Sequence, residues 1–355
     1  MNAANSTIKR IVRKTVKEDW IDFMFAHMDP MLTTNRKMAR VLSIKDETPD
    51  IKRITLRTNR HWSAFKAGQY ATFKVMIDGV FLERCYSLVS PPNSEVIEIA
   101  VKRQPYGRVS NWMHHQLEVG DTIEMADVAG EFVLPQTTPD SLLFIAGGSG
   151  VTPIFSLLVE AITRQSNVDA TVIYYANSKE DLAFGKEFDK LAEKHPSVTV
   201  HYALAEDGDA GSFSIEQLAA LCNDYSDRET YLCGPPGLMS VVSKVWEAQN
   251  ITPRLNKEVF GLPAIESDVP ANKMPIMLRR SQQELLNSKP SLLESAEAAG
   301  ARPAHGCRIG MCKTCSCTKV SGVVRDLVTG EIDDQPNTQI RICVSEPLSA
   351  VVLDI

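Results

Sequence analysis

The sequence lacks a long hydrophobic run. No apolar stretch approaches the 18 or so residues that a membrane-spanning helix needs, so we expect no transmembrane helix. The N-terminus is charged, and no apolar block follows it, which argues against a secretory signal. Basic residues are not in excess either, because the chain has 38 Lys and Arg and 44 Asp and Glu. This balance argues against nucleic-acid binding, and we expect a cytoplasmic protein, at most peripheral at the inner face of a membrane.

Cysteine is scarce, with 8 in 355 residues, yet four cysteines fall within the eleven positions 307–317. Stable disulfides are rare in a reducing compartment. Cys307, Cys312 and Cys315 have the spacing C-x4-C-x2-C, and Cys343 follows alone, which is the plant-type 2Fe–2S arrangement. Zinc usually takes paired C-x2-C units, and a thioredoxin-like pair would leave two of the four unused. The spacing therefore favours a 2Fe–2S cluster over these alternatives.

The segment before these cysteines supports that interpretation. An apolar strand is expected after Met274, and a helix is expected to begin at the cap Ser291 and to end at Gly300. Together with the cysteine spacing, this segment resembles the β-grasp fold of plant-type ferredoxins over residues 273–355. The resemblance implies that this region is a small electron-carrying domain.

Residues 38–136 alternate apolar and polar side chains in short runs separated by turns, which predicts a small antiparallel barrel. Residues 84–87 read "RCYS" and residues 107–113 read "GRVSNWM". The first stretch resembles the Arg-x-Tyr-Ser motif of the ferredoxin–NADP reductase superfamily. The resemblance implies a flavin-binding barrel.

Within that barrel, the resemblance assigns roles to single residues. Tyr86 would pack on the flavin ring, Ser87 would approach its N5 atom, and Arg84 would pair with flavin phosphate. The helix that opens at residues 107–110 would hold the pyrophosphate at its N-terminus. Its cofactor-binding candidates are Gly107, Val109 and Ser110.

Residues 137–261 alternate buried strands with helices, which predicts a parallel doubly wound sheet. The turn "GGSGVTP" at residues 147–153 lacks the third glycine of the standard dinucleotide fingerprint, but it resembles the turn of the same superfamily. The resemblance implies an NAD(P)-binding domain. Its implied coenzyme-binding residues are Gly148, Gly150 and Thr152.

Two later motifs match the superfamily in the expected order. "CGPPGLM" at residues 233–239 would place Cys233 near the nicotinamide, with Gly234 and Pro235 in the turn. "NKEVFG" would bring Glu258 and Phe260 close to the flavin and the nicotinamide. The catalytic candidates of the whole chain are Tyr86, Ser87, Cys233 and Glu258.

The identity of the cofactors follows less directly. The helix start at residue 107 suits a dinucleotide pyrophosphate, so FAD is favoured over FMN. The strand "ATVIYYA" ends in Asn177, Ser178 and Lys179 rather than in the acidic residue that binds a ribose 2′-hydroxyl. Ser178 and Lys179 could hold a 2′-phosphate, which favours NADPH, although Glu180 and Asp181 next to them leave NADH open.

The resemblance thus gives a multidomain chain of α+β and α/β type, with flavin, nucleotide and ferredoxin domains in that order and a linker at residues 262–272. It implies an electron-transfer reductase that serves an oxygenase or a desaturase. A redox sensor is the alternative from another class. The extension 1–37 carries Lys9, Arg10, Arg13, Lys14 and Lys17 before several apolar residues. It resembles the extensions of reductases that serve membrane-bound fatty acyl desaturases, so such a desaturase is the first partner expected, before an aromatic-ring or alkane oxygenase, and peripheral membrane contact is possible.

Overall fold

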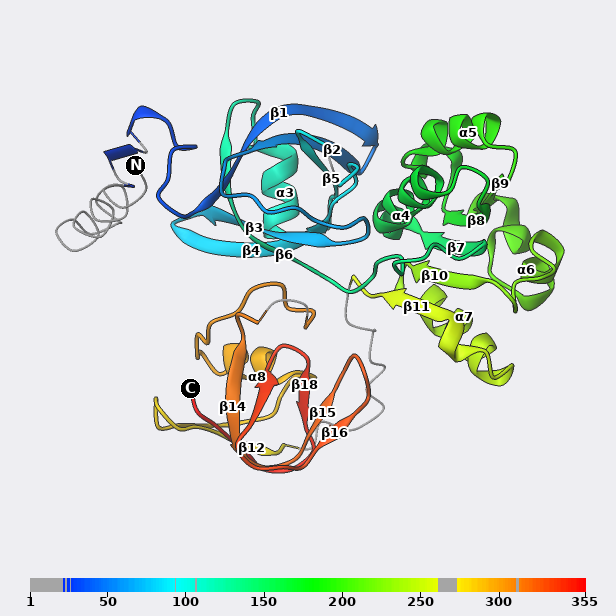
Figure 1. Cartoon of the computed structure of the whole chain (residues 1–355). Helices are drawn as coiled ribbons and strands as arrows, with labels where there is room; N and C mark the ends of the chain where they lie inside the picture. The colour runs from blue at the N-terminus through cyan, green and yellow to red at the C-terminus, as the bar shows by residue number, and fades with distance from the viewer. Residues whose placement is uncertain are drawn as a thin grey trace, which may run out of the picture.

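The computed structural model describes residues 22–355 except residues 23, 26, 93, 106, 261–272, 311 and 312. The predicted linker, most of the predicted extension and the predicted ligand Cys312 lie outside the described residues. The described chain forms three units that follow one another in sequence (Figure 1). Among the described residues, no helix is long and apolar enough to cross a membrane.

The N-terminal unit is built on a six-stranded antiparallel sheet of order β4-β3-β6-β1-β2-β5. The strands are β1 Lys37–Thr48, β2 Ile51–Thr58, β3 Tyr70–Ile77, β4 Val80–Ser87, β5 Ile97–Lys102 and β6 Thr122–Ala129. Side chains of a strand point alternately to its two faces, so every second residue of β5 faces the core: Ile97, Ile99 and Val101. Helix α3, Arg108–His115, adds Val109 and Met113 to that core. The predicted antiparallel architecture is confirmed.

The central unit is a parallel sheet of order β11-β10-β7-β8-β9. Its strands are β7 Ser141–Gly147, β8 Asp169–Ala176, β9 Val198–Leu204, β10 Glu229–Cys233 and β11 Leu255–Glu258. Its helices are α4 Val151–Arg164, α5 Gly185–Lys194, α6 Ile215–Leu221 and α7 Pro236–Ala248, and its short 3₁₀ turns are η1 Gly148–Gly150, η2 Lys179–Asp181, η3 Ala205–Gly211 and η4 Thr252–Arg254.

Alternate residues of β7 enter two separate cores in this unit. Leu142 and Phe144 join the core on the side of α4 and α5, whereas Leu143 and Ile145 join the core on the side of α6 and α7. A strand covered on both faces reads as a continuous apolar run, as "LLFIA" does. The predicted doubly wound sheet is confirmed, and its strand order reverses between β7 and β10, where such folds bind ligands.

The described residues of the C-terminal unit form one small helix and two small sheets. Its strands are β12 Pro275–Leu278, β13 Gln283–Leu286, β14 Ser316–Ser321, β17 Thr338–Arg341 and β19 Val351–Leu353 in the larger sheet, and β15 Val324–Asp326, β16 Ile332–Asp333 and β18 Ser345–Pro347 in the smaller. Helix α8, Leu292–Ala298, has the predicted cap at Ser291, which forms a capping box with Glu294.

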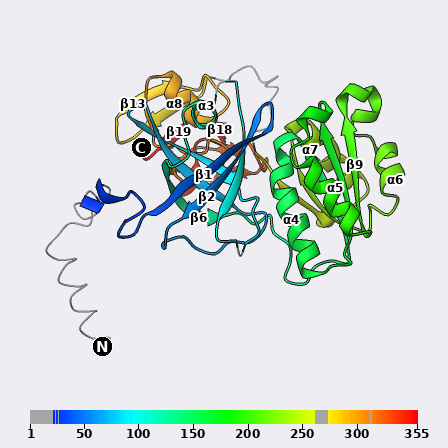
Figure 2. The same ribbon diagram turned by 90° about the horizontal axis from the view of Figure 1, so that it is seen from above.

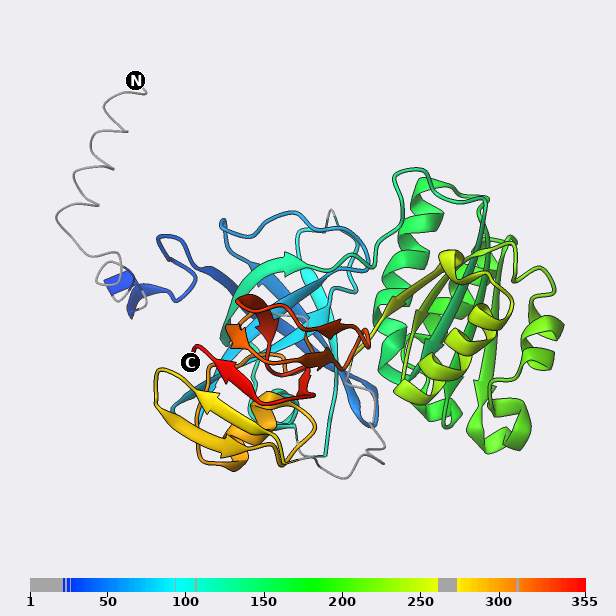
Figure 3. The same ribbon diagram turned by 90° about the horizontal axis from the view of Figure 1, so that it is seen from below.

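The C-terminal unit lies beneath the N-terminal unit in Figure 1, and the view from below places it across the N-terminal sheet (Figure 3). Two side-chain hydrogen bonds join these units among the described residues. Arg84 Nη1 donates to the carbonyl of Gly306 at 3.0 Å, and Thr314 Oγ1 donates to the Glu83 carboxylate at 2.9 Å. Strand β4 therefore touches the loop that carries the first predicted cluster ligands.

Candidate functional site

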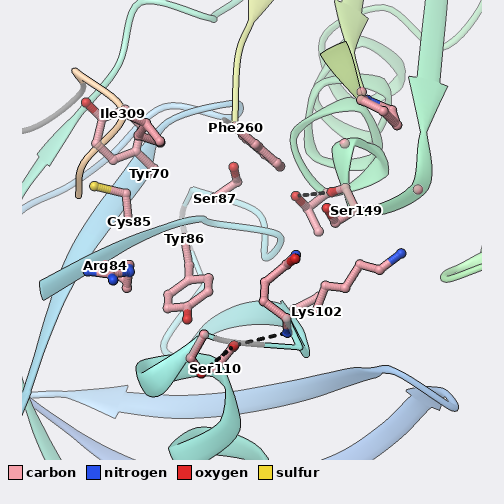
Figure 4. A pocket seen from close by; sticks show the side chains of 18 of the residues that line it. Tyr70, Arg84, Cys85, Tyr86, Ser87, Lys102, Ser110, Ser149, Phe260 and Ile309 are labelled. Carbon is pink, nitrogen blue, oxygen red and sulfur yellow. Dashed lines mark hydrogen bonds between the residues drawn. The ribbon is translucent and has the colours of Figure 1, made fainter. Parts of the chain in front are cut away.

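A cavity of about 550 Å³ opens where the three units meet. It is lined by β4 and α3 of the N-terminal unit, by the turns after β7 and β10 of the central unit, and by Cys307 and Ile309 of the C-terminal unit. Figure 4 shows Tyr86, Ser87 and Phe260 among the side chains around this space. The predicted site residues that line it are Arg84, Tyr86, Ser87, Gly107, Ser110, Gly148, Gly150, Thr152, Gly234, Pro235, Phe260 and Cys307.

Strand β4 supplies the polar end of the cavity. The Arg84 guanidinium donates to the carbonyls of Glu83 and Gly306, and no ion pair involves it among the described residues. Burial lowers the pKa of Arg84, and the charge of Arg308 adds to this effect, although an arginine keeps its proton at any physiological pH. A largely buried cation that lines a cavity without a carboxylate partner suits an anionic ligand group.

The N-terminus of α3 faces the same cavity. Gly107 is its N-cap, and a side chain there would meet Ser110 Oγ at 2.4 Å, so only glycine fits. The Ser110 hydroxyl accepts from the Gln104 amide and donates to the Gly107 carbonyl, as the dashed lines in Figure 4 indicate. The side chain of Val109, another predicted binding residue, is buried in the N-terminal core and does not line the cavity.

The glycine turn packs against the second predicted motif. Strands β7 and β10 are neighbours, with Ala146 paired to Cys233, so their carboxyl ends lie side by side. A Cβ atom on Gly150 would meet the Cys233 carbonyl oxygen at 2.2 Å, and one on Gly147 would meet Pro235 at 2.6 Å. Thr152 Oγ1 donates to the Ser149 carbonyl at 3.0 Å and fixes the start of α4. The two motifs thus form one backbone surface that a side chain would obstruct.

Two of the predicted catalytic residues are buried beside this surface rather than in the cavity wall. Cys233 is fully buried, and burial raises the pKa of its thiol, with the Glu258 charge adding to the shift. Burial also raises the pKa of the Glu258 carboxyl to about 8, and the nearby Ser87 hydroxyl offsets part of that change. Glu258 lines a smaller adjoining cavity of about 310 Å³, which shares Tyr70 and Ile309 with the first.

Buried polar atoms without partners mark the same place. Ser87 Oγ and Glu258 Oε2 are both buried and make no hydrogen bond of normal geometry within the described chain. Such atoms are costly unless a ligand or water satisfies them. Ser87 lines the main cavity and Glu258 lines the smaller one, so these atoms are open to a polar ligand group in either cavity.

Sequence reasoning missed Lys102, which lines both the main cavity and a third cavity of about 430 Å³. Its ammonium pairs with Asp50 at 3.2 Å and lies 3.8 Å from the Cβ position of Gly148. The only signal in the sequence was a basic residue at the end of an alternating strand. Its charge lies beside the glycine turn, where a pyrophosphate would pass.

The third cavity lies along the carboxyl ends of β7 and β8 and is lined by Asn177, Asp181 and Phe213 among others. Ser178 and Lys179 line none of the three cavities described here. Ser178 Oγ donates to the Asp181 carboxylate at 3.2 Å, and the backbone amide of Lys179 donates to Glu206 at 3.1 Å. The structure therefore does not bring these two predicted residues into the cavity, but places an acidic side chain there.

Three of the four predicted metal ligands are described, and all three are buried. Cys307, Cys315 and Cys343 are 4%, 3% and 1% exposed, and the sulfurs of Cys315 and Cys343 lie 3.2 Å apart. Hydrogen bonding to Cys315 raises the pKa of the Cys343 thiol, and burial adds to the shift. Within the described residues, which exclude Cys312, no three Cys, His, Asp or Glu side chains could hold a single metal ion.

The loop around these sulfurs depends on one glycine. Gly310 has a φ of 78°, and a Cβ there would meet the Val344 side chain at 3.0 Å. Its carbonyl accepts a hydrogen bond from Arg341, and its amide donates to Cys343. Cys317, just outside the predicted pattern, is buried in the core of the C-terminal unit.

Comparisons with known proteins identify the first two units. Residues 38–133 match the model of the oxidoreductase FAD-binding domain, and residues 144–244 match that of the oxidoreductase NAD-binding domain. An NADPH oxidoreductase of Mycobacterium tuberculosis is 28% identical over 100% of this chain and 92% of its own length. NADH oxidoreductase HCR of Escherichia coli is 30% identical over 80% of this chain and 86% of its own length.

Among solved structures, phthalate dioxygenase reductase matches with a TM-score of 0.61 and 26% identity. The match covers 90% of this chain and 97% of that one. That protein is described as a modular structure for electron transfer from pyridine nucleotides to a 2Fe–2S centre. The chain belongs to the family of NAD(P)H-dependent flavin oxidoreductases of the ferredoxin reductase type, whose members include the reductase components of oxygenase systems.

Proposed function

We propose that the chain takes electrons from a reduced nicotinamide coenzyme and passes them through FAD and one 2Fe–2S cluster to a protein partner. One observation carries the proposal: the cavity that holds the predicted flavin residues is also walled by Cys307 and Ile309 of the C-terminal unit. In the proposal, residues for each of the three cofactors therefore meet at this space, although Ser178 and Lys179 do not. In this proposal residues 38–136 bind the flavin, residues 137–261 bind the coenzyme, and residues 273–355 form a β-grasp ferredoxin domain.

The residues present fit a flavin dinucleotide. The Arg84 guanidinium and the N-terminus of α3 at Gly107 offer positive charge and free amides for its phosphates. The buried Ser87 hydroxyl offers a polar partner for the ring edge, and Tyr86, which is largely buried, offers an aromatic face. When bound, a flavin supplies the conversion of a two-electron hydride into single electrons.

The residues present also fit a 2Fe–2S cluster. Each iron of such a centre takes two cysteine ligands, so ligands gather in pairs rather than in threes. Cys315 and Cys343 are such a pair, and Cys307 lies on the loop that faces the flavin-side cavity. Cys312 completes the set in the proposal. The resulting centre supplies one-electron transfer.

The choice between NADPH and NADH depends on which charge reaches the adenosine ribose. The ammonium of Lys179 is exposed and makes no ion pair among the described residues, which supports NADPH, as the sequence favoured. The Asp181 carboxylate lines the third cavity, which supports NADH as the second candidate, because a carboxylate repels a 2′-phosphate and accepts from a 2′-hydroxyl.

Two substitutions separate these candidates. If NADPH is the donor, Lys179→Ala raises the KM for NADPH by at least about tenfold and leaves the KM for NADH unchanged, since one charged contact is worth about 1.5–3 kcal/mol. If NADH is the donor, Asp181→Asn raises the KM for NADH and improves turnover with NADPH. Glu193→Gln, on the outer part of α5, serves as the charge control.

The terminal partner is proposed as a membrane-bound desaturase or an oxygenase. The resemblance of the N-terminal extension supports the desaturase. The match to phthalate dioxygenase reductase over nearly its whole length supports an oxygenase. A redox sensor, the candidate from another class, would show little steady-state turnover.

The experiment that tests the proposal compares two acceptors. We expect NAD(P)H to reduce both ferricyanide and cytochrome c in the wild type, and Cys343→Ser to abolish only the reduction of cytochrome c. Cys317→Ser, a buried thiol outside the ligand pattern, is the matched control and should retain both. Equal activity of both variants with cytochrome c would show that the cluster lies off the electron path.

A further inference from the structure

Large apolar side chains are exposed at one end of the N-terminal unit. Of the eleven large hydrophobic residues that the described chain leaves exposed, six fall in two short segments. These six, which we call the apolar end, are Met24, Met28, Leu32, Met76, Val80 and Phe81, with exposed fractions of 48%, 78%, 45%, 60%, 50% and 59%. Scattered apolar residues are ordinary on a protein surface, but a gathered set marks an interaction site.

The first segment of the apolar end turns its polar side inward. Asp22, only 7% exposed, accepts hydrogen bonds from the Thr34 amide at 2.7 Å and from Arg36 at 3.2 Å. Asp29 pairs with Arg40. The Asn59 side chain donates to the carbonyl of Arg36 and so fixes the same stretch. The carboxylates thus hold the segment to the sheet.

The outer side of this segment is apolar as a consequence. Residues 24 and 28 are helical and lie four positions apart, so Met24 and Met28 share one helical face, and that face is exposed. Leu32 continues the exposed apolar set after the helix. A surface helix of a globular protein normally buries its apolar face and exposes its polar one. The reversed orientation indicates a second apolar surface that covers it.

The second segment is the tip of the β3–β4 hairpin. Asp78 and Gly79 form a two-residue turn with φ angles of 53° and 73°, the conformation of a tight primed turn. Met76 pairs directly with Phe81 across the hairpin, so these side chains stand next to each other. The Lys74 ammonium lies 4.5 Å from the centre of the Phe81 ring. The tip is therefore an ordered apolar projection with a cation beside it.

A continuous series of contacts joins the two segments. Arg36, which bonds Asp22, also pairs with Glu124 at 3.4 Å. Glu124 pairs in turn with Lys74 at 3.7 Å, and Lys74 covers the ring of Phe81. Figures 1 and 2 both place the N-terminal segment on the side of the N-terminal unit remote from the central unit. These contacts link the two segments of the apolar end to each other, and the first segment lies away from the central unit.

The chain segment that precedes the apolar end is basic, whereas the hairpin tip itself carries the exposed Asp78 carboxylate, paired with Arg108. Residues 1–17, which precede the apolar end in the chain, contain five Lys or Arg and no Asp or Glu, although the whole chain carries a net charge of −6. Basic residues next to exposed aromatic and aliphatic ones favour the interface of a bilayer rich in anionic lipid. We propose that the apolar end, including the β3–β4 hairpin, inserts into the headgroup region of an anionic membrane.

The test is sedimentation of the full-length holoprotein with vesicles of phosphatidylcholine and phosphatidylglycerol, without any electron acceptor. We expect the wild type to bind these vesicles and not vesicles of phosphatidylcholine alone. The variants Phe81→Ser and Met28→Ser should each weaken the partition constant by at least about fivefold, since each removes one large apolar side chain from the interface. Val119→Ser and Ile332→Ser, at 64% and 63% exposure elsewhere, are matched controls and should bind as the wild type does.

A second measurement reports the depth of the hairpin. We expect the fluorescence of a Phe81→Trp variant to shift to shorter wavelength on anionic vesicles and to be quenched by brominated acyl chains. Absence of vesicle binding by the wild type, or equal losses in the hairpin variants and the controls, would overturn the proposal. Binding of the apolar end to a protein partner in detergent-free solution, with no binding to vesicles, would also overturn it. Flavin content and ferricyanide reduction, measured on every variant, keep this result separate from the electron-transfer proposal.

Discussion

Replacing Glu258 by glutamine should raise the free energy of unfolding, and the size of the increase should depend on pH. The side chain is 6% exposed, and burial raises the pKa of its carboxyl from 4.5 to about 8. Between these two values the folded chain keeps the proton and the unfolded chain releases it. Unfolding is therefore accompanied by proton release, so stability falls as the pH rises from 4.5 to 8 and is level above that.

The size of the effect follows from the same shift. Each pKa unit corresponds to about 1.4 kcal/mol, so at pH 7 the buried carboxyl costs up to about 3 kcal/mol relative to a side chain that cannot ionise. Glutamine has nearly the same shape as the protonated acid and no charge. We expect Glu258→Gln to match the wild type near pH 4.5 and to exceed its free energy of unfolding by about 3 kcal/mol at pH 7.

The assay is urea unfolding of both proteins at pH 5, 6, 7, 8 and 9, read as the difference between them, so that all other titrating groups cancel. Glu247→Gln, on the exposed side of α7, is the control for the substitution itself. A difference between Glu258→Gln and the wild type that stays constant from pH 5 to 9 would refute the reasoning. A difference between the two proteins that still grows from pH 8 to pH 9 would show that the pKa of Glu258 lies above 8.

The remaining predictions concern the cofactor-binding surfaces. Arg84→Ala should weaken FAD retention by at least about tenfold, because a phosphate loses a charged partner. Arg108→Ala, which removes exposed contacts with Asp78 and with the Ile77 carbonyl, should not. Flavin release on gel filtration measures both. Gly150→Ala should slow flavin reduction by NAD(P)H in stopped flow. Its Cβ would strike the Cys233 carbonyl, and the backbone shift that this forces costs about 1–3 kcal/mol. An unchanged rate would show that the turn shifts without affecting coenzyme binding. Cys343→Ser should abolish the iron–sulfur absorbance and leave hydride uptake intact, and wild-type protein that holds zinc without iron after anaerobic purification would contradict the ligand assignment.

Local patterns in the sequence predicted most of the fold. The capping box at Ser291 depends on residues three positions apart, and the apolar run of β7 depends on neighbours in the chain. The glycine turn was predicted because glycine alone tolerates a backbone approach, and the structure shows that approach at Gly150.

Contacts between distant segments were out of reach of such patterns. Nothing near Lys102 in the sequence reveals that its ammonium lies beside Gly148, and nothing near Arg84 reveals the carbonyl of Gly306. The orientation of Ser178 also depends on a partner, because its hydroxyl donates to the Asp181 carboxylate three residues later. Residue type suggested a phosphate ligand there, and the competing hydrogen bond is visible only in three dimensions.

The two hydrogen bonds between β4 and the C-terminal loop bear on how electrons reach a protein acceptor. A hydrogen bond contributes about 1 kcal/mol net in water, so the Arg84 and Thr314 contacts together add about 2–3 kcal/mol to the docking of the C-terminal unit. We expect the C-terminal unit to act as a shuttle that loads in the docked state and unloads when it swings free. A covalent lock between Glu83 and Thr314, introduced as a cysteine pair, should then speed internal transfer and stop delivery to any protein acceptor.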